Sequence, residues 1–134
     1  MAGDDVDPDG TARLAARPAA ALASGARPSV MAFAVLMEAK LRANDRKPHW
    51  GDQPVGYLAE RLVQEAQELL AALKQWRAAV GAYEETGAAP VARAVDAVRL
   101  ECADVANFAM MIADNVGALG VTGARGQRED ERGR

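Results

Sequence analysis

The sequence predicts an all-α protein, and three features of its composition lead to that fold class. Alanine occurs 31 times among 134 residues, and alanine favours helix over strand. Isoleucine occurs once and aromatic residues six times, which is too few for the β-branched and aromatic strands of a sandwich or barrel. The single cysteine, Cys102, excludes a disulfide scaffold and a zinc finger. We therefore expect an antiparallel helical bundle of about three main helices per subunit.

The first helix is expected from about Ser29 to Asn44, directly after Pro28. Its apolar residues recur three and four positions apart, which is the period of one helix face: Val30, Phe33, Met37 and Leu41. Residues 45–54 are expected to form a loop because they contain three helix-breaking residues: Pro48, Gly51 and Pro54.

The second helix is expected from Pro54 or Val55 to about Val80, and residues 81–90 should form another loop. Its apolar stripe comprises Val55, Leu58, Leu62, Ala66, Leu69, Leu73, Trp76 and Val80.

The third helix is expected from about Pro90, a favoured first-turn residue, to Val116. Its segment 105–112 is apolar on nearly every face except at Asn107. A helix that is apolar all round is buried all round, and three helices cannot surround one of their own number. A homodimer or homotetramer is therefore expected to complete the bundle.

The folded domain is expected over residues 28–118, between disordered tails at 1–27 and 119–134 that contain few large apolar groups. No apolar run approaches the ~20 residues of a membrane span, and the acidic start is unlike a secretory signal. These features favour a cytoplasmic protein without membrane contact. The net charge of −3 argues against binding to a nucleic acid polymer.

Four acids occupy unusual positions on the second and third helices. Glu65 and Glu68 are three residues apart beside one apolar stripe, and Glu101 and Asp104 repeat the arrangement beside the other. If the two helices pack antiparallel through their stripes, the four carboxylates converge. Such a cluster repels itself, and a divalent cation removes that penalty. Ligands that are all oxygen favour Mg²⁺, with Mn²⁺ as a substitute, over zinc.

The acids and their neighbours resemble the ExxE…ExxD signature of the MazG-like all-α nucleoside triphosphate pyrophosphohydrolases. The resembling segments are 62–73 (LVQEAQELLAAL) and 101–107 (ECADVAN). The resemblance implies that the four acids bind Mg²⁺. Metal-assisted hydrolysis then needs a proton acceptor for the attacking water, and Glu65 and Glu68 are the candidates, between which spacing does not decide. The resemblance also implies cleavage between the α and β phosphates to a monophosphate and pyrophosphate, by a dimer or tetramer. Relatives often carry a tyrosine where this chain has Phe108.

Substrate contacts are expected from the loop and from the second helix. Lys47 in the loop and Lys74 after the acidic pair are candidate phosphate ligands. His49 and Trp50 lie in the same loop, where an indole stacked on a nucleobase contributes about 1–3 kcal/mol. Aromatic residues before and after the ExxE pair resemble the arrangement in pyrimidine-specific relatives.

Trp76 is a second aromatic candidate, and Asn107 is a candidate because a buried amide requires a hydrogen-bond partner. The structural alternatives are that the tryptophans pack in the core and that Asn107 bonds to a neighbouring helix.

Two other functions remain open. The acids can be solvated helix flanks that pair with Arg61 and Arg99, in which case the chain is a non-catalytic helical dimer serving as an interaction module. Alternatively, the enzyme hydrolyses another pyrophosphate-linked metabolite, such as phosphoribosyl-ATP.

Overall fold

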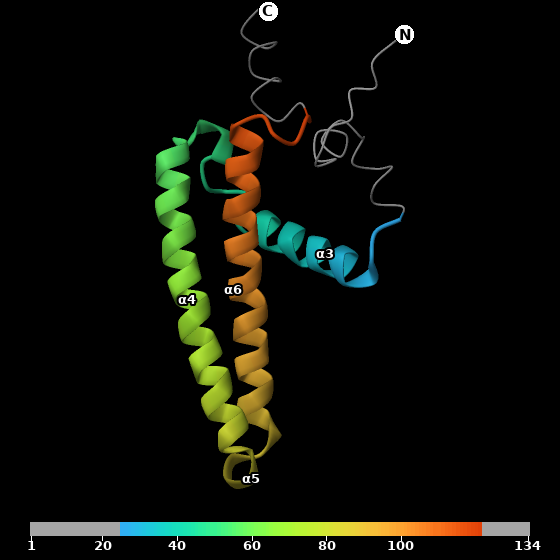
Figure 1. The fold of residues 1–134 in the computed structure, drawn as a ribbon, viewed down its shortest axis with the longest axis vertical. Coiled ribbons are helices and arrows are strands. Elements are labelled where there is room, and N and C mark those ends of the chain that lie inside the picture. The colour runs from blue at the N-terminus through green and yellow to red at the C-terminus, as the bar shows by residue number, and fades with distance from the viewer. Residues whose placement is uncertain (1–24, 122–134) are drawn as a thin grey trace, which may run out of the picture.

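The computed structural model describes residues 25–121, and every regular element among them is a helix (Figure 1). The long helices are α3 (Pro28–Ala43), α4 (Val55–Gly81) and α6 (Ala88–Asn115). Two short elements complete the order: the 3₁₀ turn η1 (Trp50–Asp52) before α4, and α5 (Tyr83–Thr86) between α4 and α6. The all-α prediction is confirmed for the described residues.

The long helices begin and end within two residues of the expected positions. The expected loop at 81–90 contains α5, in which the N–H groups of Glu85 and Thr86 both donate to the Ala82 carbonyl, at 3.0 and 2.9 Å. Gly87 then separates α5 from α6 with a φ of 77°, a left-handed conformation that glycine adopts without steric cost. α6 begins two residues before Pro90, because proline is tolerated in the first turn of a helix.

α4 and α6 lie side by side as an antiparallel hairpin joined by α5 (Figure 1). The buried apolar side chains belong to these two helices: Leu58 on α4 is 1% exposed, and Ala94 and Ala103 on α6 are 9% and 0% exposed. Alanine at the contact allows a short distance between helix axes. The close approach places the acidic flanks of both helices at one seam.

α3 projects from α6 as an arm, on the side away from α4 (Figure 1). None of its residues is buried. Two polar contacts attach α3 to α6: the Asn107 amide donates to the Met37 carbonyl at 3.1 Å, and the Lys40 ammonium lies 2.9 Å from Asp104. The three main helices pack together, but α3 contributes only its C-terminal half, where all its half-buried residues lie: Leu36, Met37, Lys40 and Leu41.

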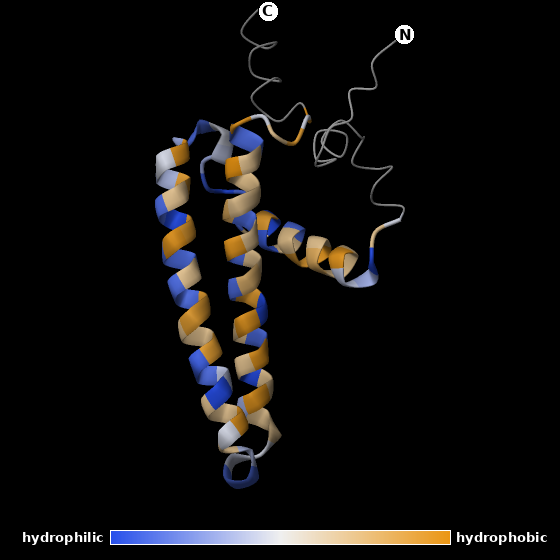
Figure 2. Ribbon diagram, viewed as in Figure 1, coloured by the Kyte–Doolittle hydropathy of each residue, from blue (hydrophilic) through white to orange (hydrophobic). Residues whose placement is uncertain are grey.

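Large apolar side chains remain exposed on the described helices: Val35 is 69%, Leu70 66%, Val63 58% and Val95 50% exposed. Apolar residues recur along α3, α4 and α6 and are mixed with polar ones (Figure 2). Segment 105–112 of α6, expected to be buried on nearly all faces, is mostly half-buried. The described helices therefore leave part of their own apolar surface uncovered.

None of the described helices combines the length and the apolar character that crossing a membrane requires. The expected tails lie almost entirely outside the described residues, which include only 25–27 and 119–121 of them.

Candidate metal centre

Three of the four predicted acids meet at the seam between α4 and α6. Glu65 on α4 and Glu101 and Asp104 on α6 each offer a carboxylate oxygen, and these oxygens lie within 4.8 Å of one another. Opposite ligands of a Mg²⁺ ion are about 4 Å apart, so small side-chain rotations allow one cation to contact all three. Glu65 is only 6% exposed, which makes its charge costly without a partner.

The pKa of the Glu65 carboxyl is raised above its ordinary value, most strongly by burial. A side-chain hydrogen bond with Glu68 and the negative charge of Glu68 raise it further. The charge of Asp104 adds to this rise, and the Arg61 guanidinium opposes it. Glu68 itself is exposed and lies outside the three-acid group, one turn after Glu65. The fourth predicted acid is therefore at the edge of the cluster, where its charge still acts on the others.

Glu101 has a raised pKa and a buried oxygen atom without a hydrogen-bond partner among the described residues. Burial raises the pKa of its carboxyl, the charges of Glu68 and Asp104 raise it further, and Lys40 lowers it. Its Oε2 atom is buried and has no hydrogen-bond partner among the described residues. A bound divalent cation would supply that partner. The donor set is entirely carboxylate oxygen, the kind of ligand that hard cations such as Mg²⁺ and Mn²⁺ prefer.

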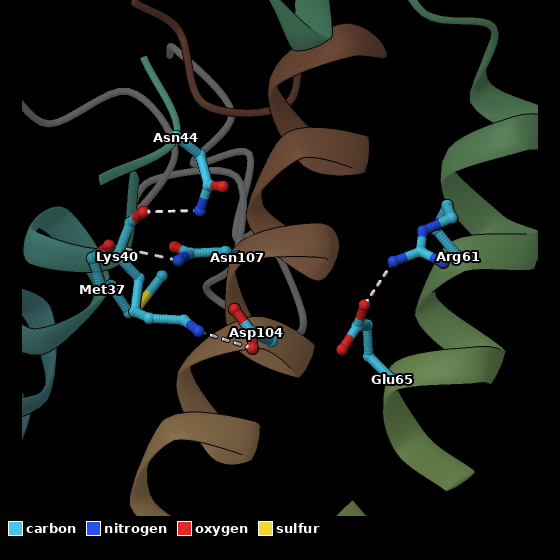
Figure 3. Close-up of polar contacts among 7 residues, drawn as sticks. All are labelled: Met37, Lys40, Asn44, Arg61, Glu65, Asp104 and Asn107. Atoms are coloured by element: carbon cyan, nitrogen blue, oxygen red, sulfur yellow. Dashed lines mark hydrogen bonds and ion pairs between the residues drawn. The ribbon is translucent and has the colours of Figure 1, made fainter. Parts of the chain in front are cut away.

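Two cations already pair with the cluster (Figure 3). Arg61 contacts Glu65 at 2.5 Å from one turn earlier on α4, and Lys40 reaches Asp104 from α3. The Arg61 guanidinium also lies 5.5 Å from the centre of the Phe108 ring, within range of a cation–π contact. The alternative of pairing between Arg61 and the acids is thus realised at Glu65, whereas Arg99 pairs with Asp96 away from the cluster.

A cavity of about 600 Å³ adjoins the acids. It lies between α3, the 45–54 loop, α4 and α6, and it is lined by apolar, aromatic, cationic and acidic side chains. The lining comprises Lys40, Leu41, Asn44, Asp45, Lys47, Pro48, His49, Trp50, Gln53, Tyr57, Leu58, Arg61, Glu65, Asp104, Asn107, Phe108 and Met111. This volume is within the range of small-molecule and cofactor sites.

The His49–Trp50 pair is held at one end of this cavity. The two rings stack with centroids 4.2 Å apart, and the Trp50 indole N–H donates to Asp114 at 2.8 Å. Asn115 donates to the carbonyls of Trp50 and Gln53, at 2.9 and 3.1 Å. The loop is therefore fixed to the C-terminal end of α6, and Trp50 has a structural role as well as a place in the lining.

Asn107 is 4% exposed and makes the hydrogen bond to a neighbouring helix that was one of its two expected roles. Its Nδ2 donates to the Met37 carbonyl, which joins α6 to α3, while its buried Oδ1 has no hydrogen-bond partner among the described residues. The amide lines the cavity one turn after Asp104.

The cavity brings together four of the predicted substrate-binding residues: Lys47, His49, Trp50 and Asn107. Lys74 and Trp76 do not line it, and both lie further along α4 towards α5. Sequence reasoning did not select Lys40, Arg61 or Tyr57 as substrate contacts, although it expected Arg61 as an ion-pair partner of the acids. The helix period could have indicated Lys40, because Lys40 is three residues after Met37 of the apolar stripe and so lies beside the same helix face.

Comparison with known proteins gives no match: neither a protein-family model, nor a curated protein, nor a solved structure corresponds to this chain.

Proposed function

We propose that this chain is a Mg²⁺-dependent nucleoside triphosphate pyrophosphohydrolase of the MazG-like kind. It would cleave the α–β phosphoanhydride of a nucleotide or deoxynucleotide to give the monophosphate and pyrophosphate. The observation that carries the proposal is the cluster of Glu65, Glu101 and Asp104, which borders a cavity with cationic and aromatic lining. A nucleoside triphosphate would use both the acid cluster and the cavity. Its phosphates require a metal cation, which the acids would hold, and its base favours an aromatic surface, which the cavity offers.

The three clustered acids would hold the metal, with Glu68 as a further ligand at the edge. When bound, Mg²⁺ neutralises phosphate charge and lowers the pKa of a coordinated water. Glu65 is a suitable proton acceptor, because burial and Glu68 raise the pKa of its carboxyl and so increase its basicity. Glu68 is the alternative acceptor, since it is next to Glu65 and less buried.

Lys47 and Arg61 would contact phosphate oxygens, since both cations line the cavity. The base would lie towards the His49–Trp50 end, where an aromatic stack is already fixed by Asp114 and Asn115. A rigid aromatic surface loses little conformational entropy when a base stacks on it.

A second copy of the chain would cover the apolar side chains that one subunit leaves exposed. Val63 and Leu70 are seven residues apart and share one face of α4, and both are more than half exposed. A homodimer or homotetramer buries such a face, and an obligate interface resembles a domain core cut in half.

Two other functions can be separated from the first by experiment. A non-catalytic helical interaction module would not need three acids within 4.8 Å of one another, because mutual repulsion makes such a cluster costly. Hydrolysis of another pyrophosphate-linked metabolite would use the same metal centre with a different occupant of the aromatic end.

The deciding experiment incubates the purified full chain with each nucleoside and deoxynucleoside triphosphate, in Mg²⁺ or in EDTA, and measures pyrophosphate and orthophosphate separately. We expect Mg²⁺-dependent pyrophosphate from at least one nucleotide. Glu65→Gln and Glu101→Gln should each abolish turnover with helix content intact, while Asp96→Asn, on the same helix as Glu101 but paired with Arg99, should retain it. Absence of pyrophosphate from every nucleotide at high enzyme concentration would refute the proposal.

A further inference from the structure

Lys40 lines the site beside Asp104, and its surroundings suggest two alternating partners. Its ammonium lies 2.9 Å from Asp104, and its side chain is 26% exposed and lines the cavity. The contact joins two helices that are far apart in sequence, so Lys40 depends on how α3 docks against α6 (Figure 3).

We propose that Lys40 holds Asp104 in the metal-free protein, releases it to the divalent cation, and then binds the phosphate chain of the substrate. This inference rests on the proposed function, and it adds a phosphate-binding residue and a competition step to it.

The balance of charge supports this exchange. Four carboxylates and two cations surround the seam in the metal-free protein, which leaves an excess of two negative charges: Glu65, Glu68, Glu101 and Asp104 against Lys40 and Arg61. A divalent cation cancels that excess, so the Lys40 ammonium is then no longer needed beside Asp104 and is repelled by the new positive charge. A polyphosphate entering the cavity offers Lys40 a stronger anionic partner than a carboxylate already shared with metal.

The two cations differ in their freedom to make this exchange. Arg61 pairs with Glu65 on its own helix, donates to Gln64 and lies against the Phe108 ring, so three contacts restrain its guanidinium. Among the described residues the Lys40 ammonium pairs with Asp104 alone, and it is a compact group on a flexible four-carbon stem. The Lys40–Asp104 ion pair is also not needed alone to hold α3 against α6, because the Asn107–Met37 hydrogen bond joins the same two helices.

The test is Lys40→Met, which keeps an apolar side chain of similar length and removes the charge. Arg42→Met is the matched control, because Arg42 is on the same helix, pairs with Glu38 and does not line the cavity. Isothermal titration calorimetry measures the affinity of the full chain for Mg²⁺ alone, and then for inorganic pyrophosphate at saturating Mg²⁺. Circular dichroism checks the helix content of each variant.

We expect Lys40→Met to bind Mg²⁺ about 3- to 10-fold more tightly, because a competing cation is gone, and to bind pyrophosphate about 10- to 100-fold more weakly. Arg42→Met should change neither affinity by more than about twofold, since its surface ion pair is exposed. Lys40→Arg should restore most of the pyrophosphate affinity.

Opposite shifts in the two affinities distinguish this role from a purely structural one. If Lys40→Met weakens both affinities, Lys40 serves only to attach α3, and the inference is overturned. If pyrophosphate affinity is unchanged, Lys40 only balances charge, and the inference is again overturned. A wild-type protein that binds neither Mg²⁺ nor pyrophosphate overturns the proposed function as well, so the two failures are distinguishable.

Discussion

Glu101→Gln removes one negative charge from the acid cluster while keeping the size of the side chain. In the metal-free protein Glu101 Oε2 is buried without a partner, and the neighbouring charges of Glu68 and Asp104 oppose ionisation of this carboxyl. An unsatisfied buried polar group costs about 1–3 kcal/mol, and an amide in its place can donate to a neighbouring carboxylate. We therefore expect the variant to be about 1–2 kcal/mol more stable than the wild type at pH 7 in EDTA.

The pH dependence of stability should change in the same variant. The pKa values of Glu65 and Glu101 are raised on folding, so the folded state binds protons more readily than the unfolded state. Stability from these groups is therefore greatest below the ordinary glutamate pKa of about 4.3, and it falls as pH rises through the raised values. Glu101→Gln should make that decline shallower.

The assay is thermal and urea unfolding at several pH values, with protein concentration fixed because an oligomer's stability depends on it. A gain of 1 kcal/mol corresponds to roughly 4–8 °C in Tm for a domain of this size. Mg²⁺ at about 100 times its Kd should stabilise the wild type by about 2.7 kcal/mol and the variant far less. Asp96→Asn should keep the wild-type pH dependence. A Glu101→Gln protein that is less stable than the wild type in EDTA, with the same pH dependence, would refute the reasoning.

Three further predictions concern the core, the loop and the exposed face. Leu58→Ala should cost about 2–5 kcal/mol in urea unfolding, because Leu58 is 1% exposed; a loss below 1 kcal/mol would contradict its place in the core. Asn115→Ala removes two hydrogen bonds to the loop and should cost about 2 kcal/mol, with a red shift in Trp50 fluorescence; an unchanged spectrum would mean that the loop stays docked without them. Leu70→Asp should lower the molar mass in light scattering towards that of one chain, and a wild type that is already a monomer would rule out the proposed oligomer.

The helices were predictable because their signals are local. Apolar residues recurring at three and four positions defined α4 and α6 to within two residues, and proline and glycine marked the intervening loops. The short helix α5 escaped prediction because Gly81 and Gly87 flank it on both sides, and four residues are too few for a periodic pattern.

The acid cluster was predictable in part for the same reason. Glu65, Glu101 and Asp104 meet because an antiparallel contact through two apolar stripes determines which flanks face each other. The exposed position of Glu68 depends on small rotations of α4 that helix periodicity does not resolve. Lys40 depends on the angle between α3 and α6, and that angle follows from packing and not from the spacing of residues.

The loop contacts were also beyond the reach of sequence reasoning. Trp50 and Asp114 are 64 residues apart, and their hydrogen bond exists only after the hairpin has formed. The sequence showed that Trp50 was unusual in its loop, and it left open whether the indole packs or binds. The structure gives it a packing role at the edge of the cavity.

Between the acids and α5, the two helices of the hairpin are equally long, and this limits the insertions and deletions that keep the acids together. From Glu65 to the end of α4, and from the start of α6 to Asp104, the chain advances sixteen positions, or about 24 Å of helix. Removing one residue from a single arm would rotate its acid by about 100° relative to the opposing helix. Removing seven residues from both arms would return each acid to nearly its original face. Length variants of this protein should therefore tolerate paired changes of two helical turns, or grafts at α5, and not single-arm changes.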